Sequence, residues 1–449
     1  MNSAAALNAD VAGVHTRRNA VPRPGITTRD VLGSLFVVMI LLVTYDKSGV
    51  TIGLGDRAII VTPYKLTFLT LAALCALASL ARRHRPPDID RRLYHLLVAF
   101  VVLQTLASLA GLIVAPGAIT LSSEAYYLIQ RLHVLFIPLV ALRCRISPRS
   151  VLKLFVAAVV MHLLFVGVQF AAPGVYRSLV DYVFDPQRLD NTYEWDGRVL
   201  AYLGLYRTAN YGAFAAAFGL LALAFSPRGP LGRALRATLV AASIGIALTG
   251  GSRSVFLMTL AGLSVFAMKT RVMRKTSSYV LVALLALAFA GSTLFFTPRL
   301  ESLRSVYAFV DPDREGSNQG KLMVVDYAAQ LFVQSPIVGW GSRRFADISA
   351  PLGNDFYANA EVHSQVLSTL LQTGLVGLTM YCAVFVAIVR RLWRRRQKDY
   401  AIVAGMFIGL GLYNIIYDAG ALDVFALFNG VAAYYALTYR KDQYSQTTS

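Results

Sequence analysis

The feature that most constrains this chain is a series of apolar blocks, each close to the length that crosses a lipid bilayer. A membrane span needs about 20 mainly apolar residues, because the hydrocarbon core is about 30 Å thick and an α-helix rises about 1.5 Å per residue. Charged or Pro/Gly-rich breaks separate the blocks, whose approximate limits are 31–45, 58–81, 93–115, 126–142, 151–173, 199–225, 235–249, 254–268, 278–297, 363–389, 400–417 and 421–439. The pattern predicts an all-α, polytopic membrane protein of about 12 transmembrane helices.

The composition supports one membrane bundle rather than several soluble domains. Hydrophobic residues make up 56% of the 449 residues and charged residues only 15%, which is far from a soluble balance. Residues 1–30 are polar, and no small-residue cleavage site follows the first apolar block, so this block is predicted to remain as the first helix. We expect a single bundle over 31–439 with a polar insertion at 298–362, between an N-terminal tail, 1–30, and a C-terminal tail, 440–449.

The net charge of +19 could indicate a nucleic-acid partner, but its distribution indicates membrane topology instead. If the N-terminus is cytoplasmic, both tails and alternate loops carry 28 of the 43 lysines and arginines but only 6 of the 24 acidic residues. This is the positive-inside pattern of a polytopic membrane protein, so we expect a lipid bilayer and no nucleic acid as partner. The aromatic-rich segments 174–198 and 298–362 then face the other compartment, where we expect short helices at the membrane surface.

Basic residues outside the cytoplasmic set are informative, because positive charge there is disfavoured unless it meets an anion. Arg253 follows two glycines and Ser252, which can cap the next helix. A guanidinium beside free N–H groups at a helix N-terminus is suited to phosphate. Arg207 lies with Asn210 in a polar cluster that enters a span at the same side. The alternative for both arginines is an anchor in the headgroup region.

Two further cations lie within or beside spans. Arg131 is about 8 Å inside its span at helical rise, deeper than an anchor requires, and could either bind substrate or pair internally with Glu124 or Asp418. Lys65 follows Pro63 closely and is the weaker candidate, since its side chain can also snorkel to the interface.

Only one of the six histidines, His363, is predicted to face the far compartment from a loop edge. An imidazole there can remove a proton from a hydroxyl, and Glu361 or Asp418 could orient it; a structural histidine is the alternative. The sequence offers no HExxH, no Cys/His cluster and no convincing DxD pair, so we predict neither a metal site nor a cofactor.

Four stretches, in order, resemble the O-antigen ligase/polymerase superfamily, most of all the O-antigen ligase. They are Tyr206–Gly212, Leu248–Ser254, Tyr327–Gly341 (which ends in SPIVGWG), and Val362–Leu367 with Thr373–Gly377. Together they cover roughly residues 200–380. Two positions depart from the family pattern: Ser364, where asparagine commonly follows the histidine, and Lys321, where an arginine often precedes the Tyr327–Gly341 stretch.

The resemblance implies a glycosyltransferase at the periplasmic face that transfers a glycan from undecaprenyl diphosphate to lipid A core oligosaccharide. Arg207 and Arg253 would hold the diphosphate, and His363 would be the base in a metal-independent inverting transfer. An O-antigen polymerase or a protein O-oligosaccharyltransferase shares these stretches. A transporter or flippase for an anionic lipid-linked glycan is the alternative from another class, although the cations cluster at one face and no repeat is visible.

Overall fold

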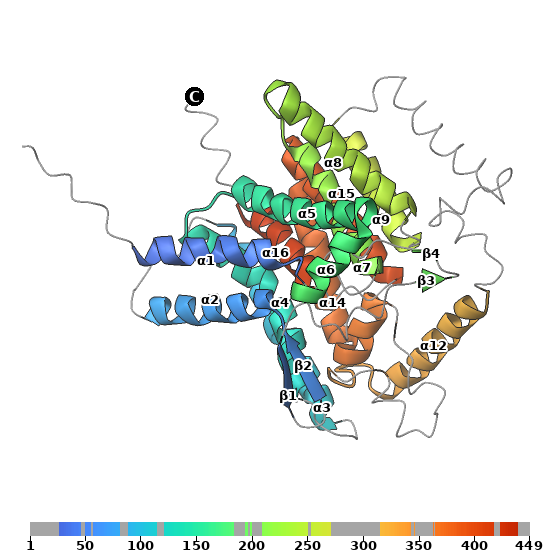
Figure 1. Cartoon of the computed structure of the whole chain (residues 1–449). Helices are drawn as coiled ribbons and strands as arrows, with labels where there is room; N and C mark the ends of the chain where they lie inside the picture. Colours follow the sequence, from blue (N-terminus) through green and yellow to red (C-terminus); the bar gives the residue numbers. More distant parts are fainter. Residues whose placement is uncertain are drawn as a thin grey trace, which may run out of the picture.

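The structure is a computed structural model that describes residues 27–45, 50–54, 57–80, 89–114, 121–183, 194–195, 198–199, 209–249, 253–270, 315–342, 345, 362, 364–416 and 423–438. Helices dominate these residues (Figure 1). They are α1 (Thr28–Leu42), α2 (Pro63–Leu80), α3 (Arg91–Val114), α4 (Leu121–Arg143), α5 (Pro148–Ala171), α6 (Pro173–Val183), α7 (Ala209–Ala217), the 3₁₀ helix η2 (Phe218–Ala224), α8 (Gly229–Thr249), α9 (Arg253–Lys269), α12 (Glu315–Gln334), α14 (Gln365–Arg394), α15 (Lys398–Ile416) and α16 (Asp423–Leu437).

Each predicted apolar block except 278–297, which lies outside the described residues, overlaps one of these helical elements. Among the described residues, five helices are long and apolar enough to cross a membrane, and four apolar helices are shorter. The all-α fold is therefore confirmed for most of the described chain, whereas the number of twelve spans stays a prediction.

Two short antiparallel hairpins were not predicted. Strands β1 (Val50–Leu54) and β2 (Arg57–Val61) pair so that Leu54 is opposite Arg57. The β-branched residues of both strands favour extended backbone, and α2 begins only at Pro63, so the predicted block 58–81 starts too early. Strands β3 (Glu194–Trp195) and β4 (Arg198–Val199) form the second hairpin.

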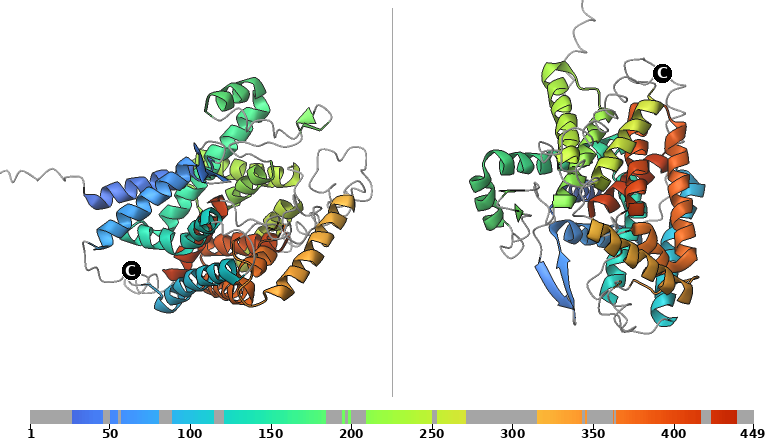
Figure 2. Two further views of the ribbon diagram at one scale, coloured as in Figure 1. Left: turned by 90° about the horizontal axis from the view of Figure 1, so that it is seen from below. Right: turned by 90° about the vertical axis from the view of Figure 1, so that its right-hand side faces the viewer.

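The centre of the bundle is α16, which is buried along almost its whole length, as expected for a helix that is apolar all round. Close packing elsewhere depends on small residues: Gly262 of α9 faces Gly405 of α15 so closely that a side chain at Gly405 would collide with the Gly262 carbonyl. Helices approach in this way in membranes, where packing replaces the hydrophobic effect. In contrast, α12 lies at the edge of the bundle in both Figure 1 and Figure 2 and packs against α14.

Loops predicted to be cytoplasmic contact one another, as the topology requires. Arg29 donates a hydrogen bond to the Cys144 carbonyl over 3.2 Å. Arg391, at the end of α14, pairs with Asp90, just before α3, over 2.8 Å. The basic segments therefore gather at one end of the bundle. Which side of a membrane this end faces stays a prediction.

Asp90 also caps α3, because its Oδ1 accepts hydrogen bonds from the backbone N–H groups of Arg92 and Leu93. Burial alone would raise the pKa of Asp90, but the hydrogen bond from Arg391, the N–H donors and the arginine charge together lower it below its ordinary value. A lowered carboxyl pKa stabilises the fold above the unfolded-state pKa, near 4, and this contribution is lost as the pH falls through the folded-state pKa.

We expect Asp90→Asn, which keeps a capping side chain but removes the charge, to lower the free energy of unfolding by about 1–2 kcal/mol at pH 7. Thermal unfolding measured between about pH 7 and pH 3 should show a smaller acid-induced loss for the variant than for the natural protein. Equal acid sensitivity of the two proteins would contradict this role of the ion pair.

Candidate functional site

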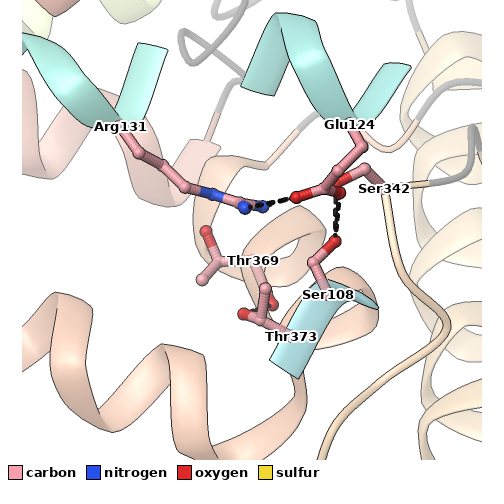
Figure 3. Close-up of polar contacts among 6 residues, drawn as sticks. All are labelled: Ser108, Glu124, Arg131, Ser342, Thr369 and Thr373. Atoms are coloured by element: carbon pink, nitrogen blue, oxygen red, sulfur yellow. Dashed lines mark hydrogen bonds and ion pairs between the residues drawn. The ribbon is translucent and has the colours of Figure 1, made fainter. Parts of the chain in front are cut away.

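At the end of the bundle opposite the basic loops, four buried side chains form one polar cluster (Figure 3). Arg131 Nη1 donates to Glu124 Oε1 over 2.9 Å, and both side chains are at most 8% exposed. Ser108 Oγ donates to Glu124 Oε2 over 2.6 Å and lies 2.7 Å from Ser342 Oγ. Arg131 Nη2 also lies 3.4 Å from Ser342 Oγ. The cluster joins α3 and α4 to the residues that follow α12.

The distance between the two ends follows from helix geometry. Eighteen residues separate Ser108 from Asp90 along α3, or about 27 Å at 1.5 Å per residue. The polar cluster and the Asp90–Arg391 pair therefore lie close to a bilayer thickness apart.

Of the two carboxylates considered for Arg131, Glu124 is the one in contact, and Asp418 lies outside the described residues. Lys65 is also paired within the bundle: its Nζ lies 3.8 Å from Asp423 Oδ2 and 4.9 Å from the centre of the Tyr126 ring. Its side chain is only 14% exposed, so the snorkelling interpretation of Lys65 is wrong. Each of these two cations has a carboxylate partner, and such pairing is how buried charges are tolerated.

Beside the cluster is a cavity of about 90 Å³ between α3, α4, α14, α15 and α16. Arg131 lines it together with tyrosines, threonines and the phenylalanines Phe100 and Phe425. Its most unusual feature is a set of six amide side chains in helices that are otherwise apolar: Gln104, Gln130, Gln365, Gln372, Asn414 and Asn429. Buried amides in apolar helices are costly, so their convergence on one cavity marks it as the candidate site.

Two stretches of the family resemblance meet beside this cavity, and one of them lines it. Gly374 has φ 62° and ψ −161°, which interrupts the helical backbone within α14. Backbone groups freed by the interruption pair with the turn after α12: Trp340 N–H donates to the Leu371 carbonyl over 2.6 Å, and Leu375 N–H donates to the Pro336 carbonyl over 2.9 Å. The turn thus replaces the missing intrahelical bonds and fixes the part of α14 that lines the cavity.

Glycine at position 374 is required for two reasons. Its backbone conformation is one that essentially only glycine adopts, and a Cβ there would collide with the Ile337 carbonyl. We expect Gly374→Ala to lower the free energy of unfolding by at least about 2 kcal/mol and to reduce the yield of folded protein. The matched control is Gly167→Ala in α5, where a Cβ meets nothing within 4 Å and alanine favours the helix. Similar melting temperatures for both variants would contradict the proposed constraint.

The N-terminus of α14 explains one departure from the family pattern. Ser364 is the N-cap residue of α14, and its Oγ accepts a hydrogen bond from the Leu367 N–H over 3.2 Å. Serine and asparagine are about equally good in this position, so the departure preserves the local structure. Immediately before it comes His363, which lies outside the described residues, while Gln365 lines the cavity.

The structure brings only some of the predicted site residues into view. Arg131 and Lys65 are both described with their side chains: Arg131 lines the cavity, and Lys65 lies next to it. Arg253 is the first residue of α9, as predicted, and Asn210 is the second residue of α7, but their side chains lie outside the described part of the structure. The other predicted site residues lie outside the described residues altogether: Arg207, Ser252, Glu361, His363 and Asp418. Their convergence stays a prediction.

Sequence reasoning missed these six amides, because within the spans it weighed mainly charged residues and histidines. Gln104, Gln130 and Asn414 each lie inside a predicted span, where an amide is nearly as informative as a charge. Within the described residues, no group of three or more His, Cys, Asp or Glu side chains is arranged to hold a metal ion.

Comparisons with known proteins address the family directly. Residues 237–382 match the family model described as O-antigen ligase, a range that includes Arg253, the turn after α12 and His363. No curated protein sequence matches the chain. A chain from a solved structure, described as "Structural coordination of polymerization and crosslinking by a peptidoglycan synthase complex", aligns with 79% of this chain and 99% of its own length. It is 18% identical with a TM-score of 0.44, a level that does not establish a shared fold. Over residues 237–382, this chain is therefore similar to the O-antigen ligase family.

Proposed function

We propose that this protein is an O-antigen ligase of the bacterial inner membrane, which transfers a glycan from undecaprenyl diphosphate to a sugar hydroxyl of lipid A core at the periplasmic face. The observation that carries the proposal is the family match over 237–382, because this range contains both the predicted base, His363, and a predicted diphosphate ligand, Arg253. Support for the side comes from the polar cluster and cavity, which lie at the end of the bundle opposite the basic loops.

In the proposed mechanism, Arg207 and Arg253 neutralise the departing diphosphate. His363, oriented by Glu361 or Asp418, removes the proton from the acceptor hydroxyl as its oxygen attacks the anomeric carbon. The C–O bond to the diphosphate breaks as the new glycosidic bond forms, which inverts the anomeric configuration. Ser252 and Asn210 would add hydrogen bonds near the diphosphate, and no metal is needed because the arginines supply the positive charge.

Arg131 and Lys65 have a different place in this proposal. Their charges are already met by Glu124 and Asp423, so they contribute less to holding a diphosphate than the two arginines do. We assign Arg131 to the wall of the adjacent cavity and Lys65 to the layer behind Gln130, where they hold substrate-facing groups in position.

The test is transfer by purified protein supplied with undecaprenyl-diphosphate-linked glycan and lipid A core, with and without a chelator. We expect glycan to appear on the core at the same rate in both conditions. Extension of the glycan on the lipid carrier, with none on the core, would identify a polymerase instead. Absence of any transfer would overturn the proposal.

A further inference from the structure

The cavity between α3, α4, α14, α15 and α16 contains an excess of hydrogen-bond acceptors. Three of its lining side chains carry a buried amide oxygen without a hydrogen-bond partner: Gln130 Oε1, Gln365 Oε1 and Asn414 Oδ1. Gln130 is 9% exposed and Asn414 is 6% exposed. A buried acceptor left unpaired costs about 1–3 kcal/mol, so three beside one cavity indicate a ligand that donates hydrogen bonds.

Neighbouring residues occupy the amide nitrogens of these three side chains, and for Gln130 the neighbour also fixes the orientation of the amide. Gln130 Nε2 donates to Asp423 Oδ1 over 2.8 Å, and Asp423 in turn pairs with Lys65. Because a carboxylate accepts only from a donor, this contact requires the NH₂ group of Gln130 to face Asp423 and leaves its oxygen unpaired. Asn414 Nδ2 donates to the Tyr381 hydroxyl over 2.9 Å, and Gln365 Nε2 donates to Thr369 Oγ1 over 3.3 Å.

The charges around the cavity exclude a phosphate as the group that these oxygens bind. Arg131, the cation in the lining, is paired with Glu124 over 2.9 Å, and Lys65 behind Gln130 is paired with Asp423. Phosphate oxygens accept hydrogen bonds, so they would be repelled by three amide oxygens and find no uncompensated cation among the described lining residues. A neutral group with several hydroxyl donors complements the same surface.

Size and shape limit the ligand further. The volume of about 90 Å³ is several times the roughly 10–15 Å³ that one water molecule needs, and it suits one small ring rather than an oligosaccharide. Phe100 and Phe425 supply apolar surface against which the less polar face of such a ring can lie.

We propose that this cavity is a subsite for one neutral, hydroxyl-rich sugar ring, bound through hydroxyl groups that donate to Gln130, Gln365 and Asn414. The inference rests on the proposed glycan transfer for the class of substrate, whereas the choice of a neutral ring over the diphosphate rests on the cavity itself. Gln365 is two residues from the predicted base, His363, so the subsite would position a sugar next to the reacting centre.

The test uses the full-length protein in lipid nanodiscs free of sugar-based detergent. Methyl glucopyranoside, methyl galactopyranoside and methyl mannopyranoside serve as probes, with inorganic pyrophosphate as the charged comparison. The variant combines Gln365→Met and Asn414→Leu, which remove two of the unpaired oxygens at similar volume. The control is Thr259→Val, because Thr259 Oγ1 is also buried without a partner but does not line the cavity.

We expect at least one methyl glycoside to bind the natural protein and Thr259→Val, as measured by saturation-transfer NMR, and to bind the double variant at least about tenfold more weakly. Pyrophosphate binding should be the same in all three proteins. The double variant loses two unpaired acceptors together with the hydrogen bonds to Tyr381 and Thr369, so these effects offset one another and its melting temperature without ligand should change little. Failure of every glycoside to bind, equal binding by the double variant, or a selective loss of pyrophosphate binding would each overturn the inference.

The outcomes for the subsite and for the proposed function are separable. Sugar binding that depends on Gln365 and Asn414, without any transfer to lipid A core, would contradict only the proposed ligase activity. If glycan is transferred to the core but the natural protein and the double variant bind the sugar equally well, only the proposed subsite is contradicted.

Discussion

Replacing Arg253 by alanine should lower the rate of glycan transfer by at least about 100-fold while the protein still folds and inserts. Arg253 is the first residue of α9, where the helix dipole and the free N–H groups already give a partial positive charge. An arginine in this position meets an unfavourable field unless an anion binds there. Removing it therefore takes away a phosphate contact without removing a stabilising one, and the melting temperature should stay the same or rise slightly.

The measurement is initial-rate transfer at saturating donor, together with thermal unfolding of each variant. Arg233→Ala is the matched control, because Arg233 is an exposed arginine in the first turns of α8 at the basic end of the bundle. If the imidazole is the base, His363→Ala should also lower the initial rate of glycan transfer by about 100-fold or more. Transfer by Arg253→Ala at the rate of the control would decide against the assigned role.

Replacing Glu124 by glutamine should lower the free energy of unfolding by about 3–5 kcal/mol, the largest effect on stability that we expect. The change leaves the Arg131 guanidinium buried without its carboxylate, and Arg131 is only 8% exposed. It also weakens the hydrogen bond from Ser108, which lies 2.6 Å from the Glu124 carboxylate. Urea or thermal unfolding of the protein in micelles measures the loss.

The combined variant Glu124→Leu with Arg131→Met should recover most of that stability, because two apolar side chains of similar size require no compensating charge. This recovery distinguishes an unpaired charge from a general packing defect. If the combined variant is as unstable as Glu124→Gln alone, the buried ion pair is not the reason for the loss.

The sequence predicted most helices correctly because apolar blocks near 20 residues long can satisfy their backbone hydrogen bonds in lipid only as helices or closed barrels. It also predicted that α9 begins at Arg253, since two glycines and a serine end one helix and begin another. The β1–β2 hairpin was missed because its β-branched residues adjoin an apolar helix, and a hydropathy pattern does not separate the two.

The pairing of side chains that are far apart in the chain was harder to predict from the sequence. Lys65 resembled a snorkelling lysine, because its partner Asp423 lies far away in the chain and comes near it only when α2 and α16 both pack against α4. The same is true of Ser108 and Ser342, which are separated by 234 residues but lie 2.7 Å apart.

The amino-acid sequence by itself determined the all-α class of most of the described chain, most of the segments that form helices, and the resemblance that the family match over 237–382 confirms, whereas the orientation implied by the basic loops stays a prediction. These properties depend only on the composition and spacing of residues that are close together in the sequence. Only the tertiary structure decided which charges neutralise one another, why Gly374 must be glycine, and that amides from five helices surround one cavity. The physical reason is that helix packing joins residues with no sequence relation, and in a low-dielectric interior such contacts decide whether a polar group is satisfied or available for a ligand.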